Sequence, residues 1–285
     1  MDKDKRNKAL KLLLKLALSA VAVFIIINKV DFSKTLDYFG DANLFFLLLA
    51  GLSFFFSKVI SAYRINAFYT TQELFLPQRL NLKLYFLGMF YNLFIPLVGG
   101  EGYKVFWLNK HYDAKVKKMV WVSLLDRLSG VVALTSLAAL LFYFASFDSG
   151  YNWLSWILIP ILYIGHYFFM RLFFNSYNGK WMLTSIHSLG VQLLQVATTF
   201  FILMSMGIEA NTVDYLFVFL LSCFAYILPM IGAREMAFIF GAEYMGLDKD
   251  LSLAIGIIFY ICLAINSLMG SYFLYKPLTP EKASS

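Results

Sequence analysis

Long apolar segments alternate with short charged loops along almost the whole chain. Each long segment reaches the roughly 20 residues that a helix needs to cross the hydrocarbon core of a bilayer. The first continues past residues 20–22, where a signal peptide would be cleaved, so we expect an uncleaved anchor there. The predicted spans are residues 10–27, 42–63, 119–146, 152–170, 184–206 and 251–275.

Four shorter apolar segments surround two breaks of similar sequence. Residues 96–101 read PLVGGE, and about half a chain later residues 229–235 read PMIGARE. Backbone groups and charges at membrane depth cost several kcal/mol each unless they are satisfied within the protein. We therefore predict two re-entrant helical hairpins, each turning at a Pro/Gly break. Their arms are residues 84–98 and 101–109 in the first hairpin, and 213–228 and 234–246 in the second.

The loop charges predict that the two hairpins enter from opposite faces. Lysine and arginine accumulate on both flanks of the first hairpin, which is typical of cytoplasmic loops. Both flanks of the second hairpin are mainly acidic. The count is then six spans and two hairpins, with both termini cytoplasmic. Broken helices that crossed fully would instead give eight spans and a parallel repeat.

The predicted fold class is an all-α integral membrane protein with a single domain, residues 1–285, built as an inverted repeat. Residues 1–146 form the first repeat, with its hairpin at about 84–109. Residues 152–275 form the second, with its hairpin at about 213–246. Three spans per repeat invert the second copy, and paired breaks near the midplane are typical of transporter substrate sites.

Composition supports the membrane class and excludes several functions. The chain is 60% hydrophobic and only 14% charged, whereas soluble domains carry about a quarter charged residues. The net charge of +7 lies largely in loops, so topology explains it better than a nucleic-acid partner. The two cysteines and three histidines have no metal-ligand spacing. No nucleophile–base pair or nucleotide-binding loop is present, so we expect neither a cofactor nor an enzyme.

The first break carries the richest set of candidate binding residues. Pro96 ends one half-helix, and the glycines permit a tight turn without Cβ clashes. The next half-helix begins near Gly100, with its positive dipole end free to face an anion. Glu101 is a candidate for holding a cation or a lipid amine, and Lys104 for pairing with Glu101 or a phosphate. The candidates here are Asn92, Pro96, Gly99, Gly100, Glu101 and Lys104.

Two further charged pairs lie at membrane depth. Asp126 and Arg127 sit inside a predicted span, where charges usually face a cavity or a partner. They either lock this span to the first hairpin or contact substrate. Gly232, Arg234 and Glu235 form the second break, where the planar arginine fork suits a lipid phosphate or a neighbouring carboxylate.

Two basic residues lie near the end of the second predicted span. Lys58 and Arg64 are expected to snorkel toward the cytoplasmic headgroups, with their stems along the apolar surface. Their charges would then sit outside the hydrocarbon core. We therefore do not count them among the candidate binding residues.

These motifs resemble the flippase-like membrane domain of lysylphosphatidylglycerol synthases and the stand-alone prokaryotic proteins that share it. The resemblance implies a cytoplasmic-membrane protein that moves an anionic, aminoacylated or polyprenyl-linked lipid between leaflets. The synthase domain of the bifunctional members is absent from this sequence, so lipid synthesis is not implied. The second motif also has fewer glycines than the family pattern. The residues that carry the resemblance are Asn92, Pro96, Gly99, Gly100, Glu101, Lys104, Asp126, Arg127, Gly130, Pro229, Gly232, Arg234 and Glu235.

The resulting hypothesis is a lipid translocator whose headgroup site lies between the hairpin tips. Lys104, Arg127 and Arg234 would attract the phosphate, while Glu101 and Glu235 would bind an amine or a coupling proton. Its partners would be membrane lipids, with a lipid-synthesising enzyme as a further candidate. The alternatives are a membrane-embedded lipid-phosphate transferase, a small-solute or ion transporter, and a scaffold subunit.

Overall fold

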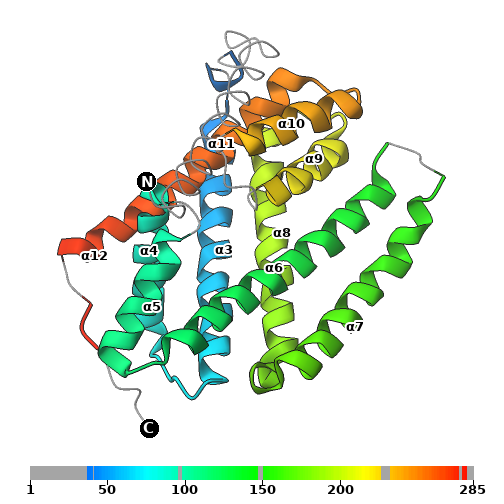
Figure 1. Cartoon of the computed structure of the whole chain (residues 1–285). Helices are drawn as coiled ribbons and strands as arrows, with labels where there is room; N and C mark the ends of the chain where they lie inside the picture. Colours follow the sequence, from blue (N-terminus) through cyan, green and yellow to red (C-terminus); the bar gives the residue numbers. More distant parts are fainter. Residues whose placement is uncertain are drawn as a thin grey trace, which may run out of the picture.

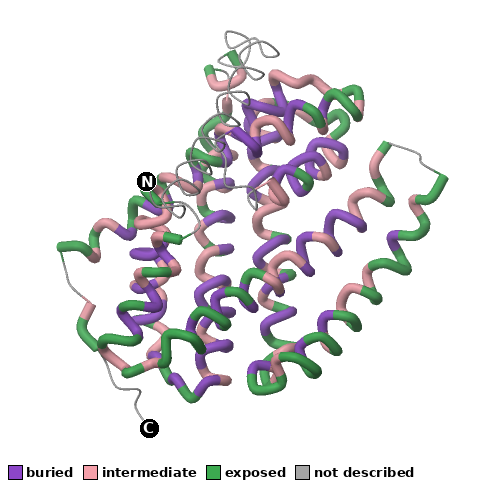
Figure 2. The backbone as a smooth tube through the Cα atoms, viewed as in Figure 1, coloured by how far each residue is buried: buried purple, intermediate pink, exposed green. Residues whose placement is uncertain are grey.

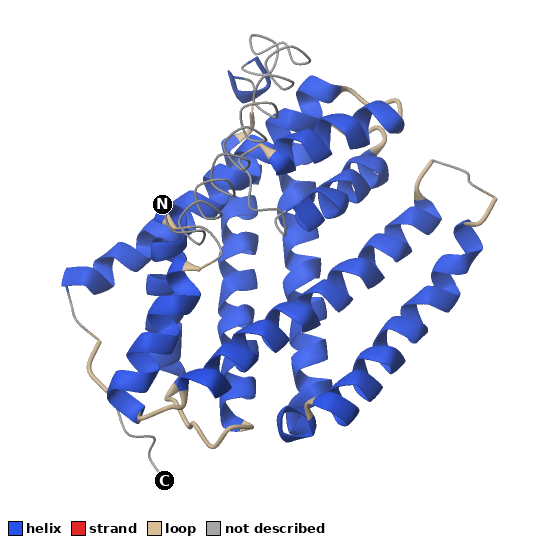
Figure 3. Ribbon diagram, in the orientation of Figure 1, coloured by secondary structure: helices blue, strands red, loops and turns tan. Residues whose placement is uncertain are grey.

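Helices make up all the regular structure that the computed structural model describes, namely residues 37–40, 42–95, 98–146, 150–225, 232–275 and 278–280 (Figure 3). The first predicted span, 10–27, lies outside the described residues. The main helices are α3 (Leu44–Thr70), α4 (Gln78–Phe94), α5 (Gly99–Tyr112), α6 (Val116–Phe144), α7 (Ser155–Phe173), α8 (Trp181–Ser205), α9 (Thr212–Phe224), α10 (Ala233–Tyr244) and α11 (Lys249–Leu268). A short α12 (Tyr272–Tyr275) follows.

Five helical segments in the described part of the chain are long and apolar enough to cross a membrane. Each coincides with one of the predicted spans, which confirms a multi-pass helical membrane protein. Two boundaries differ clearly: α3 was predicted to end near residue 63 and continues to Thr70, and the segment predicted to begin at 184 begins at Asn175. The five segments are Leu44–Thr70, Val116–Phe144, Asn152–Phe173, Asn175–Ser205 and Lys249–Tyr275.

The centre of the fold is an antiparallel pair formed by α3 and α8. At one end of the pair the Asn43 backbone N–H donates to the Ser205 carbonyl over 2.7 Å. Further along, the Ser53 hydroxyl donates to the Leu194 carbonyl over 2.8 Å. Beyond the other end, Gln72 donates to the Ser176 carbonyl over 3.1 Å. Figure 1 shows α6 crossing this pair obliquely, with α7 running back beside α6.

Helices α4 and α5 form an antiparallel hairpin that starts and finishes at the end of the molecule where α3 ends (Figure 1). Helices α9 and α10 form a second hairpin at the opposite end. There Asp214 accepts hydrogen bonds from the backbone N–H and hydroxyl of Ser146, at 2.8 and 2.7 Å. The two hairpins therefore reach toward the middle of the α3–α8 pair from opposite ends.

Each hairpin has its own apolar core. Phe54, Phe219 and Phe259 belong to the cluster of buried side chains under α9 and α10. Trp107 and Leu108 belong to the cluster under α4 and α5. The lipid-facing helix surfaces are also apolar but exposed, above all on the outermost helix, α7 (Figure 2). Exposed apolar surfaces of this kind are expected of a helix bundle that is surrounded by lipid.

Candidate functional site

The tip of the first hairpin depends on glycine because the two helices almost touch there. A Cβ atom on Gly100 would overlap the Gly88 carbonyl oxygen, and one on Gly99 would lie 2.8 Å from the Tyr91 carbonyl oxygen. The Asn92 side chain accepts a hydrogen bond from the Gly100 backbone N–H over 2.8 Å. Asn92 thus caps α5 from the facing helix. The predicted break lies at this tip, although Pro96 itself is outside the described residues.

Glu101 and Lys104 form an ion pair one turn inside α5. The Lys104 Nζ lies 2.9 Å from Glu101 Oε1, and the lysine side chain is almost fully buried. The same ammonium lies 5.1 Å from the centre of the Tyr85 ring. Glu101 Oε2 is buried and has no hydrogen-bond partner of ordinary geometry within the described structure. The Ser123 hydroxyl of α6 nevertheless lies close to this carboxylate, and Arg127 of α6 attracts it electrostatically. The predicted local pairing accounts for only one of the two carboxylate oxygens.

Asp126 pairs with Arg64 of α3. The guanidinium binds both carboxylate oxygens, with Nε–Oδ1 at 2.7 Å and Nη2–Oδ2 at 2.9 Å. Its remaining Nη1 donates to the Ser188 hydroxyl of α8 over 3.1 Å. Ser188 in turn donates to Ser129 of α6 over 3.0 Å. This network joins the three helices at the centre of the fold and occupies both oxygens of Asp126.

One expectation from the sequence is only partly met at this point and another is wrong. Asp126 locks α6 to α3, and of the predicted charged pair only Arg127 interacts with the first hairpin, at Glu101. Arg64 does not snorkel to the headgroups, because α3 continues for six further residues and buries it against α6. Gly130 provides the space, since a Cβ atom there would lie 3.3 Å from Arg64 Nη1.

Arg127 follows Asp126 directly but lies on a different face of α6. Its side chain is exposed, whereas Asp126 is buried. Arg127 interacts electrostatically with Glu101 at the tip of the first hairpin. The sequence analysis treated these two neighbouring charges as one candidate pair. In the structure they interact with different partners, Asp126 with Arg64 of α3 and Arg127 with Glu101 of α5.

At the second break, Gly232 and Arg234 have distinct local roles. Gly232 has a φ of 85°, which L side chains rarely adopt, and it precedes the first residue of α10. The Arg234 guanidinium is enclosed by three aromatic rings on α9, α10 and α11. Its Nε donates to the Ser222 hydroxyl over 3.4 Å. The rings belong to Phe219, Phe238 and Phe259, whose centres lie 5.7, 5.4 and 4.6 Å from the guanidinium carbon.

The structure gathers the candidate residues in two groups. Asn92, Gly99, Gly100, Glu101 and Lys104 lie at the first tip, with the Arg64–Asp126 pair and Arg127 nearby. Gly232, Arg234 and Glu235 lie at the start of α10, where Glu235 is half-buried.

Lys58 of α3 is a functional candidate that sequence reasoning missed. It interacts electrostatically with both Arg64 and Arg234, so it lies within electrostatic reach of both groups. The signal in the sequence is the apolar run that continues after Arg64, which moves both cations away from the end of the span.

Together these features define a multi-pass helical membrane protein with two oppositely directed hairpins and charged groups buried at their tips. The family model described as the lysylphosphatidylglycerol synthase TM region matches residues 12–270, and the chain belongs to this family. The match includes both hairpins and every candidate residue, and it confirms the resemblance drawn from the motifs. No curated protein and no solved structure matches the chain.

Proposed function

We propose that this protein translocates a charged lipid between the two leaflets of a membrane. In this proposal the headgroup passes between the hairpin tips while the hydrocarbon chains stay in the bilayer. The observation that carries it is the pair of opposed hairpins, each of which brings a buried cation, Lys104 or Arg234, into the interior of a membrane protein. Buried charges are costly in such an interior and usually mark a substrate path.

The helix lengths support re-entrant hairpins. Helices α4, α5, α9 and α10 contain 17, 14, 13 and 12 residues, all below the roughly 20 needed to cross a bilayer. Each pair also returns to the end of the molecule at which it began. We therefore favour the inverted repeat of six spans and two hairpins, with both termini cytoplasmic, over the arrangement with eight spans.

The charge balance of the candidate site favours an anionic lipid. Basic side chains outnumber carboxylates by five to three, so the site as a whole attracts a phosphate. Arg64 and Asp126 neutralise each other and hold the helices in position. Glu235 and the Glu101 oxygen that does not contact Lys104 are then the candidates for binding a lipid amine or a coupling proton. The basic residues are Lys58, Arg64, Lys104, Arg127 and Arg234, and the acidic ones are Glu101, Asp126 and Glu235.

Leaflet exchange in proteoliposomes tests the proposal directly. Headgroup-labelled phosphatidylglycerol and its aminoacylated form would be followed with wild-type protein, with Glu101→Gln and with Glu209→Gln. Glu209 is an exposed carboxylate in the α8–α9 loop and serves as the matched control. We expect Glu101→Gln to abolish exchange at temperatures where it is still folded, with a lowered unfolding temperature because the buried Lys104 ammonium loses its counter-ion. Glu209→Gln should exchange like wild type.

Two outcomes would contradict the proposal. Normal exchange by Glu101→Gln would remove this residue from the mechanism. No exchange of any lipid by the wild-type protein would favour a solute transporter or a scaffold subunit. The proposal also treats the protein as a carrier rather than an enzyme, so labelled lipid should be recovered chemically unchanged.

A further inference from the structure

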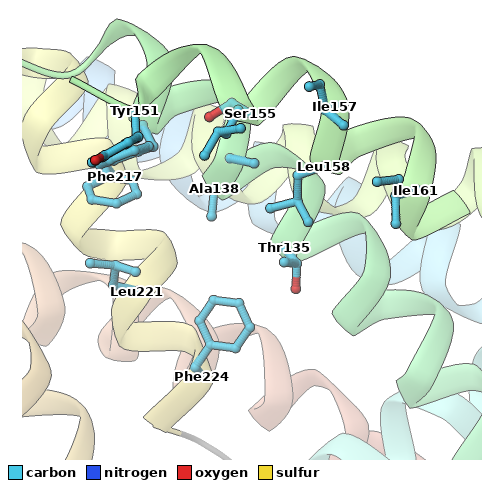
Figure 4. Close-up of a pocket in the computed structure, with 13 residues that line it drawn as sticks. Thr135, Ala138, Tyr151, Ser155, Ile157, Leu158, Ile161, Phe217, Leu221 and Phe224 are labelled. Carbon is cyan, nitrogen blue, oxygen red and sulfur yellow. The ribbon is translucent and has the colours of Figure 1, made fainter. Parts of the chain in front are cut away.

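A groove of about 650 Å³ opens between α6, α7 and α9, and none of the residues that line it is charged. Figure 4 shows side chains of all three helices turned toward it, among them Ala138, Leu158, Phe217 and Leu221. Its walls are almost entirely apolar. The volume falls within the roughly 300–1,000 Å³ that is typical of ligand sites.

The groove is open to the lipid phase because α7 is the outermost helix of the described bundle. Of the nineteen residues of α7, only Ser155, His166 and Met170 are buried. Leu158 and Ile161 line the groove and are still 41% and 58% exposed. A hydrocarbon chain could therefore enter sideways from the bilayer without crossing a polar surface.

Helix α9 connects this groove to the cations of the second hairpin. Leu221 and Phe224 face the groove near the tip of α9. Ser222 lies between them in sequence but on another face of the helix, where its hydroxyl accepts the hydrogen bond from Arg234. The apolar groove and the basic side of the hairpin are thus two faces of the same helical turn.

Lys58 supplies a cation next to this turn. It lies near the middle of α3, with its Nζ 4.4 Å from the centre of the Phe54 ring. Within the part of the chain that the structure describes, no carboxylate forms an ion pair with it. Lys58 interacts electrostatically with Cys223, the residue directly before Phe224. Lys58 therefore lies within electrostatic reach of the α9 turn that lines the groove on its other face, and no carboxylate among the described residues pairs with it.

We propose that this groove holds one hydrocarbon chain of an anionic lipid whose phosphate pairs with Lys58. An apolar groove that has a cation within electrostatic reach is complementary to an amphipathic anion. This complementarity favours an anionic lipid as the occupant over an uncharged hydrocarbon or a second copy of the protein. This inference rests on the proposed function only because it takes a lipid as the ligand. It adds the place where the hydrocarbon chain of that lipid is bound.

Photocrosslinking tests the site without requiring transport. The probe is phosphatidylglycerol with a diazirine in one acyl chain, diluted into phosphatidylcholine vesicles that contain the purified protein. We expect the label on groove-lining peptides of α6 and α9, around Ala138 and Leu221. Leu158→Trp, which narrows the groove, should lower that labelling at least fivefold. Ile164→Trp, the same kind of change on the exposed surface of α7 away from the groove, should leave it unchanged.

A second variant tests the phosphate contact. Lys58→Gln should lower groove labelling by the phosphatidylglycerol probe several-fold and leave labelling by a diazirine diacylglycerol probe, which has no phosphate, unaffected. Unfolding temperatures of all variants are measured in parallel, and Lys58→Gln provides a test that does not depend on the folding of Leu158→Trp. Uniform labelling of every lipid-facing helix, insensitive to these changes, would show bulk bilayer lipid only and overturn the inference. Protein–protein adducts from the groove would overturn it in favour of a second copy.

The photocrosslinking result and the leaflet-exchange result can be told apart. Groove labelling without leaflet exchange would support the site and overturn translocation. Leaflet exchange with no labelling of the groove would leave translocation standing and overturn the site.

Discussion

Arg64 of α3 and Asp126 of α6 are joined by two parallel hydrogen bonds, Nε–Oδ1 at 2.7 Å and Nη2–Oδ2 at 2.9 Å, inside two helices that are long enough to span a bilayer. This fork fixes both the distance between the helices and their rotation. Because Ser188 of α8 accepts the remaining guanidinium hydrogen bond, the pair positions three helices at once. Asp126 is therefore best understood as a positioning residue rather than a substrate ligand.

Removing one partner of this pair should be strongly destabilising. Asp126→Leu leaves the Arg64 guanidinium buried without its counter-ion, which typically costs about 3–5 kcal/mol. We expect a marked fall in the free energy of unfolding, measured by denaturation in detergent micelles. Asp37→Leu, which changes an exposed carboxylate at the edge of the described chain, serves as the control and should be nearly neutral.

The double variant separates the ion pair from other effects. Arg64→Met combined with Asp126→Leu removes both charges, so it should be more stable than Asp126→Leu alone. The two substitutions are expected to be non-additive, with a coupling energy in the range of about 0.5–3 kcal/mol for residues in contact. Strict additivity would show that the two side chains do not interact in the folded protein.

The sequence predicted the hairpins because their determinants are local. A glycine-rich break between two short apolar segments is enough to predict a turn at that place. The Asn92–Gly100 contact, likewise, joins residues only eight positions apart. The surroundings of Arg64 could not be predicted in this way. A charged residue after an apolar run normally ends a span, and here Asp126, 62 positions away, keeps the charge inside the helix bundle.

The environment of Arg234 shows the same limit. The charge at the start of the second half-helix was visible in the sequence, but its three aromatic neighbours come from three different helices. Only the packing of α9, α10 and α11 brings them together. The sequence thus identified the charged residues at the two breaks and left open which of them pair with each other.

The close contact at the first hairpin predicts a sharp difference between neighbouring glycines. Gly100→Ala would place a methyl group against the Gly88 carbonyl oxygen, whereas Gly102 has open space at the same point. Overpacking of this kind typically costs about 1–3 kcal/mol. We expect Gly100→Ala to lower the unfolding temperature and the exchange of labelled lipid, and Gly102→Ala to change neither. Equal behaviour of the two variants would mean that α4 and α5 are not in contact at this point.

Arg234→Lys keeps the charge but loses the planar group that lies against the phenylalanine rings. The guanidinium carbon is 4.6 Å from the centre of the Phe259 ring, close enough for a cation–π contact. Desolvated contacts of this type contribute about 2 kcal/mol, and lysine cannot stack in the same way. We expect Arg234→Lys to be destabilised in thermal unfolding. Lys249→Arg, which replaces one cationic side chain with another at the start of α11, should leave stability unchanged. A fully stable Arg234→Lys would show that charge alone is needed at this position.

Asp214 should hold the base of the second hairpin against the end of α6. Its two oxygens accept hydrogen bonds from the backbone N–H and hydroxyl of Ser146, and the side chain is buried. Hydrogen bonds to a charged group each contribute about 1.5–3 kcal/mol, so Asp214→Ala should lower the free energy of unfolding clearly. Hydrogen–deuterium exchange offers a local measurement, because the Ser146 amide loses its acceptor and should exchange faster. Glu209→Ala, an exposed carboxylate a few residues earlier, should leave both the stability and that amide unchanged. Unaltered protection of Ser146 in Asp214→Ala would contradict this anchoring of α9 and, with it, the fixed approach of the second hairpin.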